Sequence, residues 1–128
     1  MKKIKYNLFV LVLLVCNFES FSQNLPPEIS VIGDEFYCTG AAIPIVSSVV
    51  ITDDDPEDTT LEEVSIQISE GYVTGADLLS LSGVNPNINA QWNLSEGILR
   101  LTGPATFAEF EFAIENVFFE TTEVQPTQ

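Results

Sequence analysis

The chain has 128 residues and a formal net charge of −15, with 4 Lys and Arg residues against 19 Asp and Glu. Binding to nucleic acid or to anionic membranes depends on Lys and Arg, so neither is expected as a partner, whereas divalent cations are. The sequence has no histidine, which removes the usual general base and the commonest ligand for zinc or copper. Its runs of Val, Ile and Phe are too apolar for the disorder that high charge often indicates.

Residues 1–22 have the pattern of an export signal. A positive start, a short apolar core and small residues before a cleavage point follow one another: Lys2, Lys3 and Lys5, then residues 8–15, then Ser20 and Ser22. The apolar run is shorter than the roughly 20 residues that cross a bilayer. We therefore expect a secreted or cell-surface protein that is not inserted in the membrane after the signal is cleaved.

Cleavage after residue 22 would change both charge and cysteine content. It would leave Arg100 as the one basic residue against eighteen acids, a formal charge of −17. It would also remove Cys16. The alternative is a lipoprotein signal, in which Cys16 would be lipidated. Such signals place a small residue before the cysteine, and Val15 does not fit that pattern. Cys38 would remain without an internal disulfide partner. A buried thiol is the simpler interpretation of Cys38, and a bond to a partner is the alternative.

Short apolar segments alternate with turn residues after a polar lead-in at 23–27. This pattern predicts one all-β domain over residues 28–120, followed by a polar tail at 121–128. The expected strands are 28–32, 43–51, 61–69, 77–81, 88–94, 98–102 and 117–120, and residues 36–38 form either a short further strand or a bulged continuation of the first. Segment 61–69 alternates most cleanly and should place Val64, Ile66 and Ile68 on one face. Short, regularly spaced strands favour a β-sandwich, and Trp92 is expected to anchor its core.

One segment departs from the period of a strand. Thr106 and Glu109 have the spacing of a capping box, in which each side chain accepts a free backbone N–H of the other residue. Apolar residues then recur at helical spacing: Phe107, Phe110, Ile114 and Val117. We predict one short helix over Ala105–Ala113 that ends near Asn116, with its phenylalanines in the core.

The most distinctive stretch is the acidic turn at residues 52–58, Thr-Asp-Asp-Asp-Pro-Glu-Asp, between two expected strands. Its five carboxylates repel one another, so the turn is either fully solvated or neutralised by a cation. Calcium prefers carboxylate and carbonyl oxygens of loops. The spacing does not fit an EF-hand, because Asp58 stands where glycine is needed. The expected calcium ligands are Asp53, Asp55 and Asp58 of the turn, Asp77 of the next loop and Glu28 where the domain begins.

Much of residues 26–119 resembles the cadherin-like Ig-fold repeat of large secreted and surface adhesins of gliding bacteria. The most specific segments are Gly-Tyr-Val-x-Gly-x-Asp-x-Leu from Gly71 and Leu-x-Leu-x-Gly-Pro-Ala from Leu99. The resemblance implies an Ig/cadherin-like β-sandwich with an inserted helical turn, arranged in tandem, with calcium at acidic loops and adhesive or carbohydrate-recognising neighbours. Such repeats continue into a final strand, so it also implies a module cut short before that strand.

No catalytic arrangement is marked in the sequence. Its serines lack a histidine partner, it has no Gly-x-Ser-x-Gly motif, and no carboxylate pair stands out. We therefore expect a non-enzymatic extracellular adhesion or spacer module with calcium as its ligand, and neighbouring modules or surface glycans as partners. The alternative is a carbohydrate-binding module, which needs an exposed aromatic platform such as Tyr72 or Trp92. A fragment of a secreted hydrolase is the third interpretation.

Overall fold

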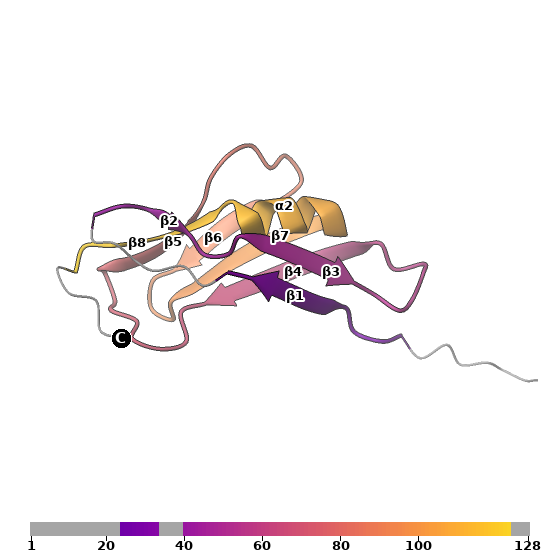
Figure 1. Ribbon diagram of the computed structural model, residues 1–128, viewed down its shortest axis with the longest axis horizontal. Coiled ribbons are helices and arrows are strands. Elements are labelled where there is room, and N and C mark those ends of the chain that lie inside the picture. The colour runs from indigo at the N-terminus through magenta and orange to yellow at the C-terminus, as the bar shows by residue number, and fades with distance from the viewer. Residues whose placement is uncertain (1–23, 34–39, 124–128) are drawn as a thin grey trace, which may run out of the picture.

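The computed structural model describes residues 24–33 and 40–123 (Figure 1). The expected export signal, both cysteines, the expected strand 36–38 and most of the polar tail lie outside these residues. The described part is mostly β-structure with one short helix, as predicted. Its elements are β1 (Glu28–Ile32), β2 (Ile43–Pro44), β3 (Ser48–Thr52), β4 (Thr60–Gln67), β5 (Asp77–Leu81), β6 (Asn89–Asn93), β7 (Ile98–Thr106), α2 (Phe107–Glu115) and β8 (Val117–Thr121).

The strands form three small antiparallel sheets, in the orders β1-β3, β2-β8-β5 and β4-β7-β6. The β3–β4 turn and the start of β1 lie at one end of the molecule, whereas the end of β8 and the start of β5 lie at the other (Figure 1). In the part of the chain that the structure describes, no helix is both long and apolar enough to span a bilayer.

One hydrophobic core joins the three sheets and the helix. Its most deeply buried side chains come from β7, α2 and β8: Leu99, Leu101, Phe110 and Val117. The predicted alternation of β4 is confirmed, since Val64 is buried and Ile66 half-buried while Ser65 and Gln67 are exposed. Trp92 packs against this core from β6 as a partly buried side chain.

The single strand predicted for residues 43–51 is wrong. Residues 43–44 pair with β8, whereas residues 48–52 pair with β1. Between them the chain passes from one sheet to another: Ile45 N–H donates to the Val117 carbonyl at 3.0 Å, and Ser47 N–H donates to the Ile32 carbonyl at 2.8 Å. Ser47 and Ser48 interrupt the apolar run just where the chain reaches β3, and the prediction joined the apolar residues on both sides of them into one strand.

The predicted helix is confirmed, with its start two residues later than expected. Thr106 is its N-cap, and the capping box is complete: Glu109 N–H donates to Thr106 Oγ1 at 3.3 Å, and Thr106 N–H donates to Glu109 Oε2 at 2.8 Å. The later start follows from pairing, because Ala105 is still opposite Leu61 in the β4–β7 ladder. Phe110 is fully buried, as the helical spacing predicted.

Candidate metal site

The acidic turn that joins β3 to β4 is held in shape by its own first aspartates. Asp53 Oδ1 accepts the backbone N–H of Asp55 at 2.8 Å, the local bond that lets an aspartate fold the chain two residues on. The Asp55 carbonyl accepts the N–H of Asp58 at 3.1 Å, which turns the chain back toward β4. The first bond orients the Asp53 carboxylate, and together the two bonds set the course of the backbone that carries all three carboxylates.

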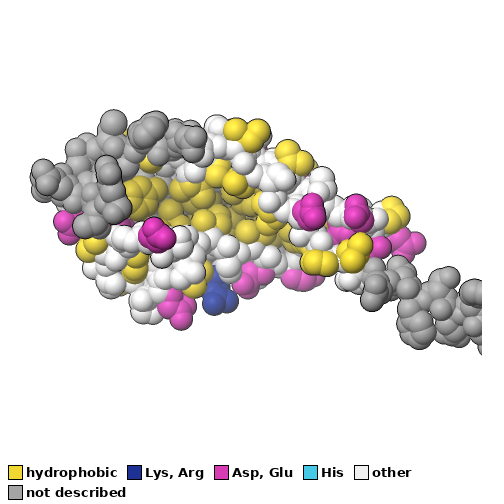
Figure 2. Space-filling model, turned by 60° about the horizontal axis from the view of Figure 1, so that its bottom comes forward, with side chains coloured by type: hydrophobic (Ala, Val, Ile, Leu, Met, Phe, Trp, Pro, Cys, Tyr) yellow, Lys and Arg dark blue, Asp and Glu magenta, His cyan; other side chains and the backbone are white. Residues whose placement is uncertain are grey.

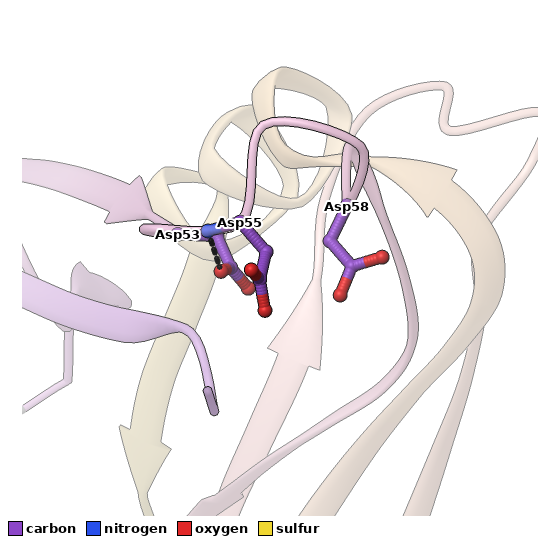
Figure 3. A group of neighbouring side chains, drawn as sticks. All are labelled: Asp53, Asp55 and Asp58. Carbon is purple, nitrogen blue, oxygen red and sulfur yellow. Dashed lines mark hydrogen bonds between the residues drawn. The ribbon is translucent and has the colours of Figure 1, made fainter. Parts of the chain in front are cut away.

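The turn brings Asp53, Asp55 and Asp58 together. One carboxylate oxygen of each lies within 4.8 Å of the other two. The Asp53 and Asp55 side chains lie side by side and point the same way, and Asp58 descends from the returning limb beside them (Figure 3). Two oxygens that share one Ca²⁺ at about 2.4 Å can be at most roughly 4.8 Å apart. The spacing of this triad therefore fits a common calcium ion.

The lead-in segment also reaches the triad. Leu25 N–H donates to Asp55 Oδ2 at 3.0 Å. When the Asn24 amide nitrogen faces the acids, it lies 2.6 Å from Asp58 Oδ2 and 3.0 Å from Asp55 Oδ2. The opposite orientation of the amide places its oxygen among the carboxylates, where it would act as a cation ligand. The site thus draws groups from the lead-in as well as from the turn.

Among the described residues, the triad has little access to an internal counter-charge. Arg100 is the only Lys or Arg after Lys5 in the sequence. It makes an exposed ion pair with Glu63 of β4, with a 3.4 Å separation between Arg100 Nη1 and Glu63 Oε1. Asp53 and Asp55 are half-buried and Asp58 is exposed. Partial burial keeps two of the carboxylates from full solvation, so a cation would reduce the repulsion among all three.

The other two expected ligands lie elsewhere. Glu28 is opposite Thr52 in the β1–β3 ladder, so it lies at the same end of the molecule as the turn but outside the triad. Asp77 begins β5 opposite Thr121, at the other end of the molecule (Figure 1). Asp77 is buried, and its carboxylate accepts the backbone N–H of Val73 at 2.8 Å, which closes the turn before β5. The structure therefore gives Asp77 a role in its own loop.

Sequence reasoning missed the lead-in groups at Asn24 and Leu25. The pairing of two predicted strands could have placed these groups near the acidic turn. If residues 28–32 pair antiparallel with the strand that precedes the turn, the residues before Glu28 must run alongside the residues after Thr52. The lead-in then lies against the acidic turn. Strand pairing, however, is not a local property of the sequence.

The two aromatic residues considered for sugar binding pack on each other. The Tyr72 and Trp92 rings are edge-to-face, with centroids 6.0 Å apart and planes at 78°. The Tyr72 hydroxyl donates to the Leu94 carbonyl. Both side chains are half-buried, so this pair does not present the flat exposed platform that sugar stacking needs.

Comparison with protein-family models, with curated proteins and with solved structures found no match to this chain.

Proposed function

We propose that this chain is a non-enzymatic extracellular module with an adhesive or spacer role in a cell-surface protein, and that calcium at the acidic turn rigidifies the point where the chain enters the domain. The observation that carries the proposal is the convergence of three carboxylates and the lead-in on one point. An ion bound there with the Asn24 amide oxygen as a ligand would link the lead-in to the β3–β4 turn, beside the hydrogen bond that Leu25 N–H donates to Asp55. Such a link is useful in a module that must hold a fixed direction relative to its neighbour.

The finer fold assignment belongs to the same proposal. An Ig/cadherin-like β-sandwich is supported by the sequence segments after Gly71 and Leu99, and by antiparallel sheets around one core. The inserted helical turn that the resemblance implies corresponds to α2 (Phe107–Glu115), which lies between β7 and β8. Neighbouring modules and surface glycans remain the proposed partners.

The choice of calcium rests on the donor set. The site offers hard oxygen atoms from carboxylates, with an amide oxygen available from Asn24, and no imidazole is present anywhere in the sequence. Calcium accepts six to eight such ligands in flexible geometry, including water. Magnesium requires a near-ideal octahedron and gives up water reluctantly. Three protein carboxylates that leave the remaining ligand positions to water and carbonyl oxygens therefore favour calcium over magnesium.

Thermal unfolding in calcium and in chelator tests the proposal. An ion that binds only the folded state at about 100 times its Kd stabilises it by about 2.7 kcal/mol. For a domain of this size, each kcal/mol shifts Tm by about 4–8 °C. We expect calcium to raise Tm by about 10 °C or more at saturation, and magnesium at equal ionic strength to raise it far less. Equal melting temperatures in calcium and in chelator would show that the acidic turn is a solvated loop that does not bind calcium.

The cellular location is tested separately. Residues 1–30 fused to alkaline phosphatase, which is active only after export, should give enzyme activity in a bacterial host. Replacing Leu11 and Leu13 by arginine interrupts the apolar core of the expected signal and should abolish that activity. Full activity of the arginine variant would show that this segment is not an export signal.

A further inference from the structure

Two side chains of β1, Ile29 and Val31, lie on the core-facing side of the β1–β3 sheet but remain exposed. Ile29 is opposite Ile51 and Val31 is opposite Val49. Directly opposed residues share one face of a sheet. Ile51 and Val49 are 5% and 4% exposed, so this is the core face, yet Ile29 and Val31 are 48% and 58% exposed. β1 thus extends the core face of its sheet beyond the area that other elements cover.

The backbone of β1 presents its free hydrogen-bonding groups at the same residues. The N–H groups of Val49 and Ile51 donate to helix side chains, so they point away from β1. Residues opposite each other without mutual hydrogen bonds point their N–H and C=O groups outward. The backbone groups of Ile29 and Val31 therefore face the open edge of the sheet. Within the described chain, no backbone group bonds to them there.

The two edges of the β1–β3 sheet differ in their protection. The outer edge of β3 is covered by the carboxylates of Glu111 and Glu115. The outer edge of β1 has none of the devices that usually protect an edge: within Glu28–Ile32 there is no lysine, no proline and no inward-pointing charge. Instead its inward side chains are isoleucine and valine. An edge with this character is a template for an added strand.

Figure 2 turns forward the side of the molecule on which β1 and β4 lie. Apolar side chains form a hollowed strip along this side; acidic side chains stand below the strip and above its right end, and one basic side chain stands among those below. The charged groups that belong to the flanking strands include Glu28 on β1 and Glu62 and Glu63 on β4. The groove is therefore apolar along its floor, and its margins carry acidic side chains with Arg100 as the one cation of the described residues, already paired with Glu63.

We propose that the open edge of β1 binds an extended segment of a partner polypeptide, antiparallel to β1, whose apolar side chains alternate with Lys or Arg. The apolar residues would stand opposite Ile29 and Val31 and cover the core face. The basic residues would lie on the outer face beside Glu28, where opposite charges on neighbouring strands attract. This proposal does not depend on the calcium site.

The charge of the chain selects such a partner over a second copy. Beyond Lys5 the chain has one basic residue, Arg100, and that residue pairs with Glu63. A second β1 would bring another Glu28 and no cation to the edge. The basic alternating segment supplies both the apolar face and the missing positive charge.

Nuclear magnetic resonance with a defined peptide tests the proposal. The probe is a synthetic peptide of sequence Lys-Val-Lys-Val-Lys-Val-Lys, and its control has the same composition with the alternation broken. We expect the probe to shift the amide signals of β1 and to slow hydrogen exchange at Ile29 and Val31, while the control has at least tenfold weaker affinity. Protection confined to β4 or β6 would place the binding edge elsewhere and overturn the proposal.

Two glutamate variants separate strand addition from general attraction of a basic peptide. Val31→Glu removes an apolar contact on the core face and should weaken binding at least tenfold. Ser30→Glu adds the same charge on the outer face, beside the peptide lysines, and should tighten binding about two- to fivefold. Simple electrostatic attraction predicts tighter binding for both variants, and that result would contradict the inference.

A change in the peptide tests the same contact without altering the protein. In antiparallel pairing, the peptide valines opposite Ile29 and Val31 direct their N–H groups at β1. N-methylation of the valine amides should abolish protection, whereas N-methylation of the lysine amides should preserve affinity within about threefold. Equal loss in both peptides would reject the proposed pairing. Sedimentation of the protein alone provides the remaining test: concentration-dependent dimers with protected β1 amides would make a second copy the occupant instead.

Discussion

The backbone N–H of Ile51 donates a 2.7 Å hydrogen bond to Glu111 Oε1, and one helical turn further on Glu115 Oε1 accepts the N–H of Val49 at 3.1 Å. Residues four apart on a helix are about 6 Å apart along its axis. Residues two apart on a strand are separated by about 6.6 Å. The two spacings nearly match. The glutamates of α2 can therefore accept the N–H groups along the edge of β3, where another strand would otherwise pair.

Loss of this edge contact should destabilise the fold. Glu111→Ala leaves the N–H of the buried Ile51 without its acceptor, and an unpaired buried donor costs about 1–3 kcal/mol. Glu111→Gln keeps an acceptor oxygen but no charge, so its cost should be smaller. Urea unfolding measures both free energies. Glu120→Ala, which removes an exposed acid from β8, is the matched control. Equal stability of the Glu111→Ala and Glu120→Ala variants would show that the contact contributes nothing.

The capping box should make stability depend on acid. Three hydrogen bonds favour the carboxylate and lower the pKa of Glu109 below its ordinary value of 4.5: first from the Thr106 backbone N–H, then from the Thr106 hydroxyl and from Asn87. A carboxyl group whose pKa is lowered on folding stabilises the protein above its unfolded pKa. That contribution is lost as pH falls from about 4.5 through the folded value.

The corresponding prediction compares Glu109→Gln with the parent protein across pH. At pH 7 the parent should be more stable, and the difference should shrink as pH is lowered to about 3, since the parent's Glu109 then becomes protonated. Urea unfolding at each pH gives the two curves. Glu120→Gln serves as the control for loss of an exposed negative charge. A parent–variant difference that is constant over this pH range would rule out the proposed contribution.

The N-cap itself has a separate cost. Thr106→Ala removes the oxygen that accepts the Glu109 N–H, and loss of such a cap costs about 0.5–2 kcal/mol. Thr106→Ser keeps the hydroxyl and should recover most of the loss. Unfolding monitored by circular dichroism measures both variants. If serine and alanine destabilise equally, the hydroxyl is not the stabilising group.

Sequence reasoning succeeded where the signal is local. The Thr106–Glu109 spacing, followed by apolar residues at helical intervals, located the helix because capping and periodicity both act within a few residues. The expected proximity of Asp53, Asp55 and Asp58 is seen in the structure for the same reason, since one short turn contains all three. Asp77 was grouped with them, although β5 begins at the far end of the molecule (Figure 1). Strand order decides such distances, and no local pattern encodes it.

Because strand pairing is not a local property, the sequence also failed to predict the change of sheet within residues 43–51 and the approach of the lead-in to the acidic turn. Residues 43–51 are mostly apolar, and the serines at 47–48 are the mark of the change of sheet between Pro44 and Ser48, but two serines do not distinguish a break from the polar positions of one strand. Asn24 approaches Asp58 only because β1 pairs with β3 in one register. Ile29 and Val31 alternate as core residues do, and the structure is needed to show that half of each remains in water.

Two phenylalanines of α2 provide a matched test of the core. Phe110 is fully buried, whereas Phe112 is 53% exposed. Phe110→Ala should cost about 3–5 kcal/mol, because it removes apolar contacts and leaves a cavity. Phe112→Ala should change stability by only about 0.5 kcal/mol, as exposed sites usually do. Helix propensity changes alike in both variants, so comparable losses in urea unfolding would contradict the assignment of the core.

The ligand set of the calcium site can be separated residue by residue. Asp53→Asn and Asp55→Asn each remove one carboxylate of the triad and should abolish most of the Tm increase in calcium. Glu28→Gln changes an acid at the same end of the molecule but outside the triad, so most of the increase should remain. In chelator, both triad variants should match or exceed the parent, because removing one charge relieves repulsion among the three.

Asp77→Asn distinguishes a structural acid from a ligand. Its carboxylate accepts the Val73 N–H from a buried position, so the variant should lower Tm in chelator by weakening that turn. The further rise of Tm on adding calcium should equal that of the parent, since Asp77 lies at the opposite end of the molecule from the triad (Figure 1). A calcium response lost in Asp77→Asn but kept in Asp53→Asn would move the ion to the β5 loop. It would then be the Gly75–Asp77 turn, and not the acidic turn, that binds calcium.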